Sequence, residues 1–247
     1  PDDIARQLIA NDVAGQYFEH KIPCSAGLVS CIMPTKNRRQ FVPRALACFL
    51  AQTYDNKELI VLDNGEDSIS DLIPRYKVGR DNALLATWPQ IRYIRMTSEQ
   101  KTGQLRNFCC QMASGEFIAH WDDDDWSHPR RLEEQVAAIG DKSVTGYQKI
   151  MFHGPGDTVL QYSGGHEYAV GTSLLYRRAW WEKNRFPAQQ VGEDADFVSR
   201  ARGNIVVTDG LDRMVAVTHA GNTSPRLTKN QEWVKVDVSK LPEGYQL

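Results

Sequence analysis

Four consecutive carboxylates, Asp122 to Asp125, stand between two tryptophans in the segment HWDDDDW. Two unit charges about 4 Å apart repel by roughly 1 kcal/mol in water and by about 4 kcal/mol near a protein surface. A divalent cation such as Mn²⁺ or Mg²⁺ would remove this repulsion, because it prefers oxygen ligands and often bridges carboxylates to a diphosphate. The alternative is a solvated acidic turn, since carboxylates also stabilise the first turn of a helix.

The aspartates directly follow the apolar segment EFIAHW (116–121), which predicts a buried strand. Alternate side chains of an extended chain share a face. We therefore expect Asp122 and Asp124 to point one way. Asp123 and Asp125 would point the other way. One pair would meet a metal and a nucleotide, and the other would accept hydrogen bonds from backbone amides or a helix start.

Strand and helix patterns alternate in front of this cluster. Apolar segments predict strands at 28–34, 57–63, 91–96 and 116–121, with helical stripes between them. This order predicts a mostly parallel α/β sheet flanked by helices. Ligands bind beyond the carboxyl ends of such strands, which is where the polar residues stand. Ser127 is expected to cap a further helix after the cluster.

The overall composition limits the class of protein. The chain has 247 residues and a formal net charge of −2, so a nucleic-acid partner is not indicated. No apolar run approaches the roughly 20 residues of a membrane span, and the acidic N-terminus lacks a signal region. The five cysteines match no zinc pattern and are expected to be buried free thiols. We expect a cytoplasmic protein without a transmembrane segment. Peripheral contact with a membrane is compatible with this expectation.

The segment after the first strand is PTKNRR rather than G-x-G-x-x-G, which disfavours a dinucleotide-binding Rossmann site. Thr35 can offer hydrogen bonds to a base, and Arg38 can approach a phosphate. Asp63, at the end of the second strand, can accept from a base or a ribose hydroxyl. It can equally form a turn with the Asn-Gly pair that follows. Arg106 can bind a base or diphosphate, or it can pair with Asp63 or Asp122.

Several segments, in a fixed order, resemble the family 2 glycosyltransferases of the GT-A fold, from about residue 28 to about residue 224. VSCIMPTKNR resembles that family's first strand and the turn after it, and ELIVLDNGEDS resembles its second strand with a nucleotide-facing aspartate. KTGQLRNFCCQMASGEFIAHWDDDDWSHPRRLEEQV is similar to the most diagnostic stretch, with its Asp-x-Asp-Asp and following proline. GEDADFVSR is similar to the family's Glu-Asp motif.

The resemblance implies a GT-A type nucleotide-binding sheet and a smaller mixed acceptor-side region. The implied activity is inverting, metal-dependent transfer of a sugar from a nucleotide-diphosphate donor, with UDP expected, to a hydroxyl acceptor such as a glycan. The expected organisation is an N-terminal helix and linker (1–26), a glycosyltransferase domain with nucleotide-binding (27–140) and acceptor-binding (141–224) halves, and a C-terminal tail (225–247).

The resemblance also implies roles for individual residues. Asp124 and Asp122 are assigned to a Mn²⁺ or Mg²⁺ ion, and His219, after an apolar strand, is expected to complete its coordination. The alternative for His219 is a surface histidine. Donor binding is expected from Pro34, Thr35, Asn37, Arg38, Asp63, Lys101, Gly103, Arg106, Asp122 and Asp123.

Inverting transfer also needs a carboxylate that takes the proton of the acceptor hydroxyl. The Glu-Asp motif supplies Asp194 as the first choice and Glu193 as the second. Taken alone, this pair would read as the first turn of a helix.

Acceptor binding is expected from Trp126, directly after the acidic run, and from Gly171 and Thr172, which resemble the lining of the family's acceptor cleft. Tyr162 and Tyr168 offer further aromatic faces in the acceptor-side half.

Two other functions stay open at this level. A sugar-1-phosphate nucleotidyltransferase would carry a Gly-rich basic loop after the first strand, and PTKNRR has the charges without the glycines. A non-catalytic module that binds nucleotide sugars would lack the base or the metal motif, and both motifs are present.

Overall fold

The computed structural model describes residues 24–73, 90–223 and 232–245, so most of the predicted N-terminal helix and linker lies outside the described residues. The first half of the chain supplies four strands: β1 (Ser25–Thr35), β2 (Lys57–Asp63), β3 (Gln90–Arg95) and β4 (Gly115–His120). They lie in the order β3-β2-β1-β4, and all three pairings are parallel. The predicted parallel sheet is thereby confirmed.

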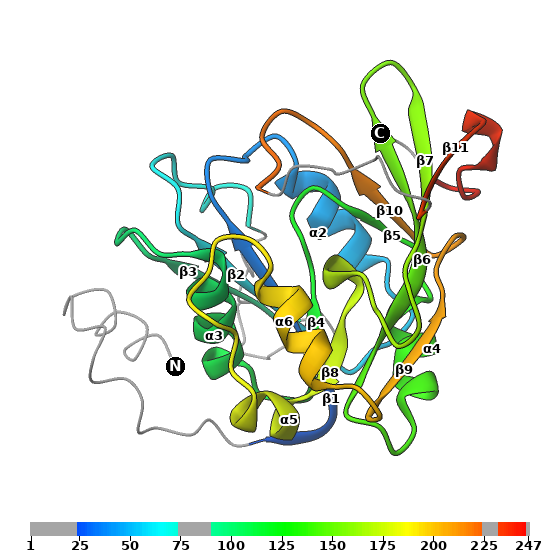
Figure 1. Cartoon of the computed structure of the whole chain (residues 1–247). Helices are drawn as coiled ribbons and strands as arrows, with labels where there is room; N and C mark the ends of the chain where they lie inside the picture. The colour runs from blue at the N-terminus through cyan, green and yellow to red at the C-terminus, as the bar shows by residue number, and fades with distance from the viewer. Residues whose placement is uncertain (1–23, 74–89, 224–231, 246–247) are drawn as a thin grey trace.

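Helices cover both faces of this sheet because its strands are apolar on both sides. Along β1, Val29, Cys31 and Met33 pack into one core cluster, while Ile32 packs into another. The first cluster includes residues of α2 (Val42–Leu50) and α4 (Arg131–Ile139). The second includes residues of α3 (Thr102–Met112), α5 (Arg178–Lys183) and α6 (Glu193–Arg200), which Figure 1 shows grouped on one side of the sheet.

The second half extends the sheet with mostly antiparallel pairings. Its strands are β6 (Val144–Gly154), β7 (Thr158–Ser163), β8 (Leu175–Arg177), β9 (Ile205–Asp209) and β10 (Met214–Val217). Strand β8 joins β4 to β6 antiparallel, and β6 continues antiparallel to β7. Strands β9 and β10 pair parallel to different parts of β6. This is the smaller mixed region that the resemblance implied.

The described part of the C-terminal segment, residues 232–245, contains two short regular elements. Strand β11 (Trp233–Val236) pairs antiparallel with β7, with Trp233 opposite Tyr162, and a short 3₁₀ helix, η2 (Val238–Lys240), follows. A four-residue strand has too few positions to show a periodic pattern, and its partner lies about 70 residues earlier in the chain, so no local signal announced it.

Some predicted boundaries differ from the observed ones. Pro34 does not end β1 but pairs with Leu62 inside it, and the strand continues to Thr35. Ser127 does not cap a helix, because it lies in the short strand β5 (Trp126–Ser127), which pairs with β10. The following helix α4 begins at Arg131 instead.

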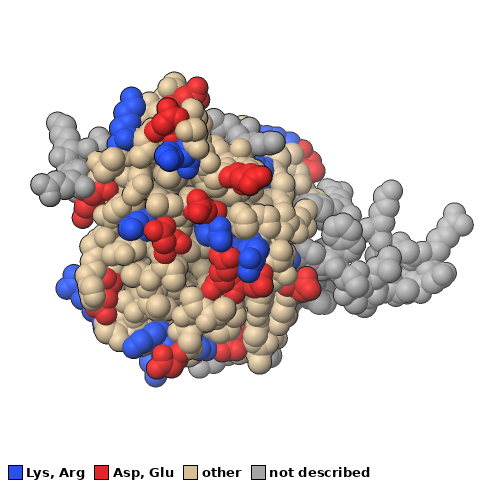
Figure 2. Space-filling model, turned by 90° about the vertical axis from the view of Figure 1, so that its right-hand side faces the viewer, with Lys and Arg blue, Asp and Glu red and all other residues tan. Residues whose placement is uncertain are grey.

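The distribution of surface charge agrees with the composition, whereas the burial of the cysteines agrees with the prediction only in part. Figure 2 shows basic and acidic side chains interspersed over one face, in keeping with the near-balanced charge. Four cysteines are buried and free, whereas Cys24 is exposed, contrary to the expectation for all five. Within the described ranges, no helix combines the length and apolar character that crossing a membrane requires.

Candidate active site

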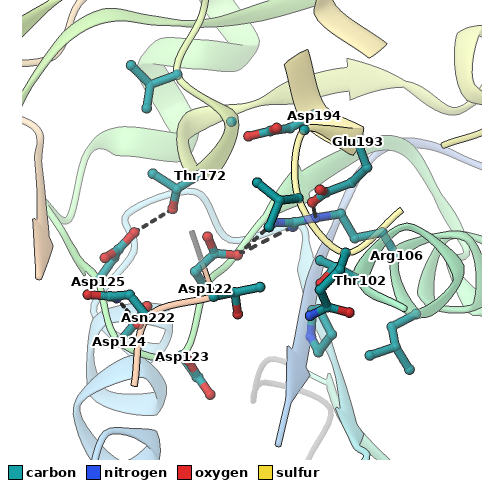
Figure 3. A pocket seen from close by; sticks show the side chains of 18 of the residues that line it. Thr102, Arg106, Asp122, Asp123, Asp124, Asp125, Thr172, Glu193, Asp194 and Asn222 are labelled. Carbon is teal, nitrogen blue, oxygen red and sulfur yellow. Dashed lines mark hydrogen bonds and ion pairs between the residues drawn. The ribbon is translucent and has the colours of Figure 1, made fainter. Parts of the chain in front are cut away.

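The four aspartates lie in a turn after β4, not on an extended strand. The chain leaves β4 at His120, turns at Asp123 and Asp124, and becomes extended again in β5. Figure 3 shows the four side chains directed to different parts of a cavity. The predicted alternation of faces is therefore wrong, because side chains of a turn do not follow the two-residue period of a strand.

Asp123 is held by a residue at the end of β1 and by one in the loop that follows it. Thr35 Oγ1 donates to its Oδ2 at 2.5 Å, and Arg38 Nη1 donates to its Oδ1 at 3.1 Å. The same Nη1 atom lies 3.0 Å from Oδ2 of Asp124, so two adjacent aspartates share one guanidinium. Burial and the neighbouring Asp124 charge raise the pKa of Asp123 to about 7, against the opposing effect of Arg38.

Asp124 meets His219 because of the pairing between β5 and β10. These strands run antiparallel with Val215 opposite Trp126, which carries the chain after β10 back over the aspartate turn. Nε2 of His219 lies 2.9 Å from Oδ2 of Asp124, and Asn222 Nδ2 donates to the same oxygen at 3.1 Å. The structure thus brings together two of the three residues assigned to a metal.

These two side chains can take part in binding a divalent cation. Among the described residues, no group of three or more His, Cys, Asp or Glu side chains is placed to hold a metal ion by itself. Nε2 of His219 and Oδ2 of Asp124 lie 2.9 Å apart, and neighbouring ligand atoms of an octahedral ion with bonds of about 2.1 Å lie roughly 3.0 Å apart. The residues therefore fit a cation shared with a substrate diphosphate, provided that Arg38 releases the Asp124 carboxylate.

The third residue assigned to the metal, Asp122, has a different partner. A guanidinium nitrogen of Arg106, on α3, lies 3.3 Å from its Oδ1. Nε of Arg106 lies 3.1 Å from Oε1 of Glu193, on α6. Burial acts to raise the pKa of Asp122, yet the Arg106 charge helps to hold it below its ordinary value. Of the pairings considered for Arg106, the one with Asp122 is observed.

Glu193 is fixed in this ion pair and is almost fully buried, as is Arg106. Burial raises the pKa of Glu193 despite the neighbouring guanidinium. Removing one partner of such a buried pair typically costs about 3–5 kcal/mol, because an uncompensated charge remains. Glu193 is therefore a residue that ties α6 to α3.

Asp194 is the more accessible member of the Glu-Asp pair. It follows Gly192, whose left-handed conformation (φ 85°) precedes α6, and it reaches over the short 3₁₀ helix η1 (Gly171–Ser173). A Cβ atom at Gly171 would stand 1.6 Å from Oδ2 of Asp194, so this approach requires glycine. Figure 3 shows Asp194 on the other side of the cavity from Asp123 and Asp124.

Buried side chains hold η1 in place. His120 Nδ1 donates to the carbonyl of Gly171 at 2.7 Å, and Arg131 Nη2 donates to the carbonyl of Thr172 at 3.1 Å. Thr172 Oγ1 in turn donates to Oδ2 of Asp125 at 2.5 Å. Burial, followed by the Arg106 charge, lowers the pKa of His120 well below its ordinary value, so the ring is neutral. The segment under Asp194 is thus tied to the aspartate turn.

One cavity of about 750 Å³ joins these parts, a size typical of the roughly 300–1,000 Å³ of small-molecule sites. The predicted residues that line it are Pro34, Thr35, Arg38, Arg106, Asp122, Asp123, Asp124, Gly171, Thr172, Glu193 and Asp194. His219 does not line it but contacts Asp124. The cavity therefore has carboxylates and cations at the sheet edge and Asp194 across from them.

Asp63 does not line the cavity. It is 1% exposed, and its Oδ2 accepts from Tyr93 at 2.7 Å and from Arg95 at 2.8 Å. Its Oδ1 accepts from the backbone amide of Gly65, as in the alternative turn. The Asp63 side chain fixes the end of β2 against β3. It therefore does not reach the cavity in which a nucleotide would bind.

Four further predicted residues lie elsewhere. Asn37 accepts from the Glu66 amide, and Lys101 is exposed at the start of α3. A Cβ at Gly103 would stand 1.9 Å from the carbonyl oxygen of Pro187, so this glycine serves packing. Trp126 is buried against Tyr245 and does not line the cavity.

The cavity also has lining residues that the sequence did not indicate, among them Thr102, Phe152 and Trp233. Thr102 stands next to predicted Lys101, so the helix start itself was a usable signal. Phe152 and Trp233 lie on strands that both pair with β7. This pairing directs their side chains into the cavity, and no local sequence pattern indicates such a pairing.

The sequence profile described as "Glycosyl transferase family 2" matches residues 30–197. The chain belongs to this family. The match covers both the aspartate turn and the Glu-Asp pair, so the family 2 assignment includes the residues that face each other across the cavity.

Two curated relatives are similar to part of this chain. The "Putative colanic acid biosynthesis glycosyl transferase WcaA" of Escherichia coli (strain K12) is 35% identical over 110 residues, which are 44% of this chain and 37% of that protein. The "UDP-Glc:alpha-D-GlcNAc-diphosphoundecaprenol beta-1,3-glucosyltransferase WfgD" of Escherichia coli is 36% identical over 114 residues, which are 45% of this chain and 41% of that protein. The chain spans less than half the length of these relatives.

Solved structures share the fold. S. aureus TarS 1–349 in complex with UDP-GlcNAc superposes with a TM-score of 0.63 at 19% identity and covers 81% of this chain and 62% of that one. The mannosyltransferase PcManGT from Pyrobaculum calidifontis, in complex with GDP-Man and Mn²⁺, superposes with a TM-score of 0.57 at 16% identity and covers 87% of this chain and 62% of that one. This family 2 chain therefore has the GT-A architecture.

Proposed function

We propose that the cavity catalyses transfer of a sugar from a nucleotide-diphosphate donor to an acceptor hydroxyl, with inversion at the anomeric carbon. The observation that carries this proposal is the placement of Asp194 across one cavity from the aspartate turn. An inverting transfer needs a base on one side of the sugar and a charged site for the leaving diphosphate on the other side.

The donor would bind at the sheet edge. Thr35 ends β1 and Arg38 lies in the loop after it, while Arg106 approaches from α3. Hydroxyl and guanidinium donors therefore face the aspartate turn from two sides. Arginine recognises phosphate through paired N–H donors. We assign the diphosphate to Arg38 and Arg106, and the ribose to Asp122.

Asp124 and His219 would hold a divalent cation, Mn²⁺ or Mg²⁺, which supplies positive charge at the departing diphosphate when bound. Nε2 of His219 and Oδ2 of Asp124, which lie 2.9 Å apart, support this assignment because both atoms can bind a metal ion. One solved structure with this fold, PcManGT, was obtained with Mn²⁺.

Asp194 would accept the proton of the acceptor hydroxyl. The hydroxyl oxygen bonds to the anomeric carbon while the bond from that carbon to the diphosphate oxygen breaks. Glu193 is the weaker candidate, because its carboxylate is buried against Arg106. Gly171 leaves room for Asp194 on the cavity side.

We favour UDP as the donor nucleotide. WfgD, by its name, uses UDP-Glc, and TarS was solved with UDP-GlcNAc, whereas PcManGT was solved with GDP-Man. The experiment that tests the function is incubation of the protein with a panel of UDP- and GDP-sugars, with and without Mn²⁺, while free nucleoside diphosphate is measured. We expect slow, metal-dependent release from one donor. Absence of both release and donor binding across the panel would overturn the proposal.

A further inference from the structure

Tyr245, which follows β11 and η2, packs against the segment that leaves the aspartate turn. Trp126 directly follows Asp125 in the chain, and its ring meets that of Tyr245 edge to face, with the two centroids 5.8 Å apart. Neither ring lines the cavity. Tyr245 also packs against the core cluster that contains Trp126. The turn that carries the carboxylates is thus supported from outside the cavity by a residue far along the chain.

The hydroxyl of Tyr245 meets a buried histidine. It lies 2.9 Å from Nδ1 of His153, on β6. His153 is paired with Val217 where β6 meets β10, and the Val217 amide donates to Oδ1 of Asp125 at 3.0 Å. The chain after Val217 leads directly to His219. The hydroxyl therefore helps to hold the strand end that is bonded to the aspartate turn and that carries His219.

A guanidinium lies between Tyr245 and the backbone of the turn. Burial raises the pKa of Tyr245 to about 12, while the Arg44 charge opposes this rise and the Asp125 charge adds to it. The phenol is therefore neutral near pH 7, and both charged groups lie close to it. Arg44, on α2, donates from Nη2 to the backbone carbonyl of Asp124. Tyr245 thus stands beside a side chain that holds the turn by its backbone.

We propose that Tyr245 is a positioning residue for the cation site of the transfer reaction. Its ring supports Trp126, and its hydroxyl supports His153. Together these contacts keep the aspartate turn and the end of β10 in register, so that Oδ2 of Asp124 and Nε2 of His219 stay 2.9 Å apart. Residues behind the ligands of a metal commonly set its affinity in this way. The inference rests on the cation role given to these two ligands under the proposed function.

Packing alone is the alternative role for Tyr245. The family profile matches residues 30–197, so it assigns no role to this residue. If the ring only fills the core, phenylalanine should serve as well at the cation site, because it packs in the same way. If the hydroxyl positions His153, its removal should change the cation site while the ring contact with Trp126 remains. Tyr245→Phe therefore separates the two roles.

The test is calorimetry of UDP binding with and without Mn²⁺ on wild type, Tyr245→Phe and Tyr245→Ala, at a temperature at which circular dichroism shows all of them folded. We expect the gain in UDP affinity from Mn²⁺ to fall by about 10-fold in Tyr245→Phe and further in Tyr245→Ala. UDP affinity without Mn²⁺ should stay unchanged, since we assign the diphosphate to Arg38 and Arg106. Binding of Mn²⁺ alone, followed by electron paramagnetic resonance, should weaken in the same order.

Tyr54→Phe is the matched control. Tyr54 is also half-buried, packs against the same core cluster, and donates its hydroxyl to the carbonyl of Gly27 at 2.5 Å. This variant also loses a hydrogen bond, with the stability that the bond contributes, but it should keep the full gain from Mn²⁺.

An unchanged gain from Mn²⁺ in both Tyr245 variants would overturn the inference and leave the proposed function intact. An equal loss of this gain in Tyr54→Phe would also overturn it, because the effect would then be a general loosening of the core. Absence of any gain from Mn²⁺ in wild type would instead defeat the proposed cation role, and this inference with it.

Discussion

Nη1 of Arg38 lies 3.0 Å from Oδ2 of Asp124, the same oxygen that His219 and Asn222 contact. The internal guanidinium thus occupies one side of the carboxylate that we assign to a metal. A cation that binds Asp124 must share or replace this contact.

The first prediction follows from that competition. Arg38→Gln should strengthen binding of Mn²⁺ alone by about 10-fold, because a hydrogen bond to a charged group is worth roughly 1.5–3 kcal/mol and this one would be lost. The same variant should bind UDP more weakly without metal, since it lacks a phosphate donor. Mn²⁺ titration followed by electron paramagnetic resonance measures the first effect, and calorimetry the second. Arg39→Gln is the control, because Arg39 pairs with Asp71 at the surface. Weaker Mn²⁺ binding by Arg38→Gln would contradict the competition.

Asp194→Asn should leave UDP affinity unchanged and lower sugar transfer by about 10²–10⁴-fold, the usual contribution of a general base. The amide keeps the size of the carboxylate but accepts no proton. Steady-state kinetics and calorimetry on the same preparation separate the two effects. Asp196→Asn is the matched control on α6, since Asp196 is exposed and pairs with Arg200. Near-normal transfer by Asp194→Asn would place the base elsewhere.

Gly171→Ala should displace the Asp194 carboxylate without changing its chemical nature. The added Cβ would stand 1.6 Å from Oδ2 of Asp194, so the side chain must move. A shift of this kind can lower a reaction rate by about 100-fold. Gly165→Ala provides the comparison, because no atom lies within 4 Å of its added Cβ. The kinetic assay decides: equal activity of wild type and Gly171→Ala would show that Asp194 does not need its observed position.

The thiols give a prediction that is independent of catalysis. Burial raises the pKa of Cys31 and of Cys110 to about 12, and burial also raises those of Cys48 and Cys109, so these four thiols stay protonated near pH 8. The thiolate is the reactive form. Iodoacetamide at pH 8 should therefore modify the folded protein once, at exposed Cys24, and all five cysteines after denaturation. Intact-mass spectrometry counts the additions, and fast modification of any buried thiol would contradict the packing.

The sequence predicted the first half of the fold well because its signals are strong and local. Strands β1, β2 and β4 are apolar runs that end in polar residues, and a parallel sheet places those ends at one edge. This is why Thr35, Arg38 and the aspartates meet in one cavity. The short strands β8 and β11 lacked such signals, since they are formed by pairing with distant segments.

The errors at the site have a common physical cause. A strand end is visible in a sequence, but the direction of the side chain there is not. Asp63 stands opposite Arg95 in the pairing of β2 with β3, and its carboxylate forms an internal ion pair with that arginine. Trp126 is similarly buried in the core because it lies in β5.

We propose that a divalent cation at Asp124 joins the aspartate turn to a nucleotide diphosphate. Calorimetry of UDP binding with and without Mn²⁺, on wild type and on Asp124→Asn, tests it most directly, with the exposed Asp157→Asn as control. We expect Mn²⁺ to strengthen UDP binding to wild type and to the control, and to have no effect on UDP binding to Asp124→Asn. The same gain from Mn²⁺ in Asp124→Asn, or no gain in wild type, would contradict it.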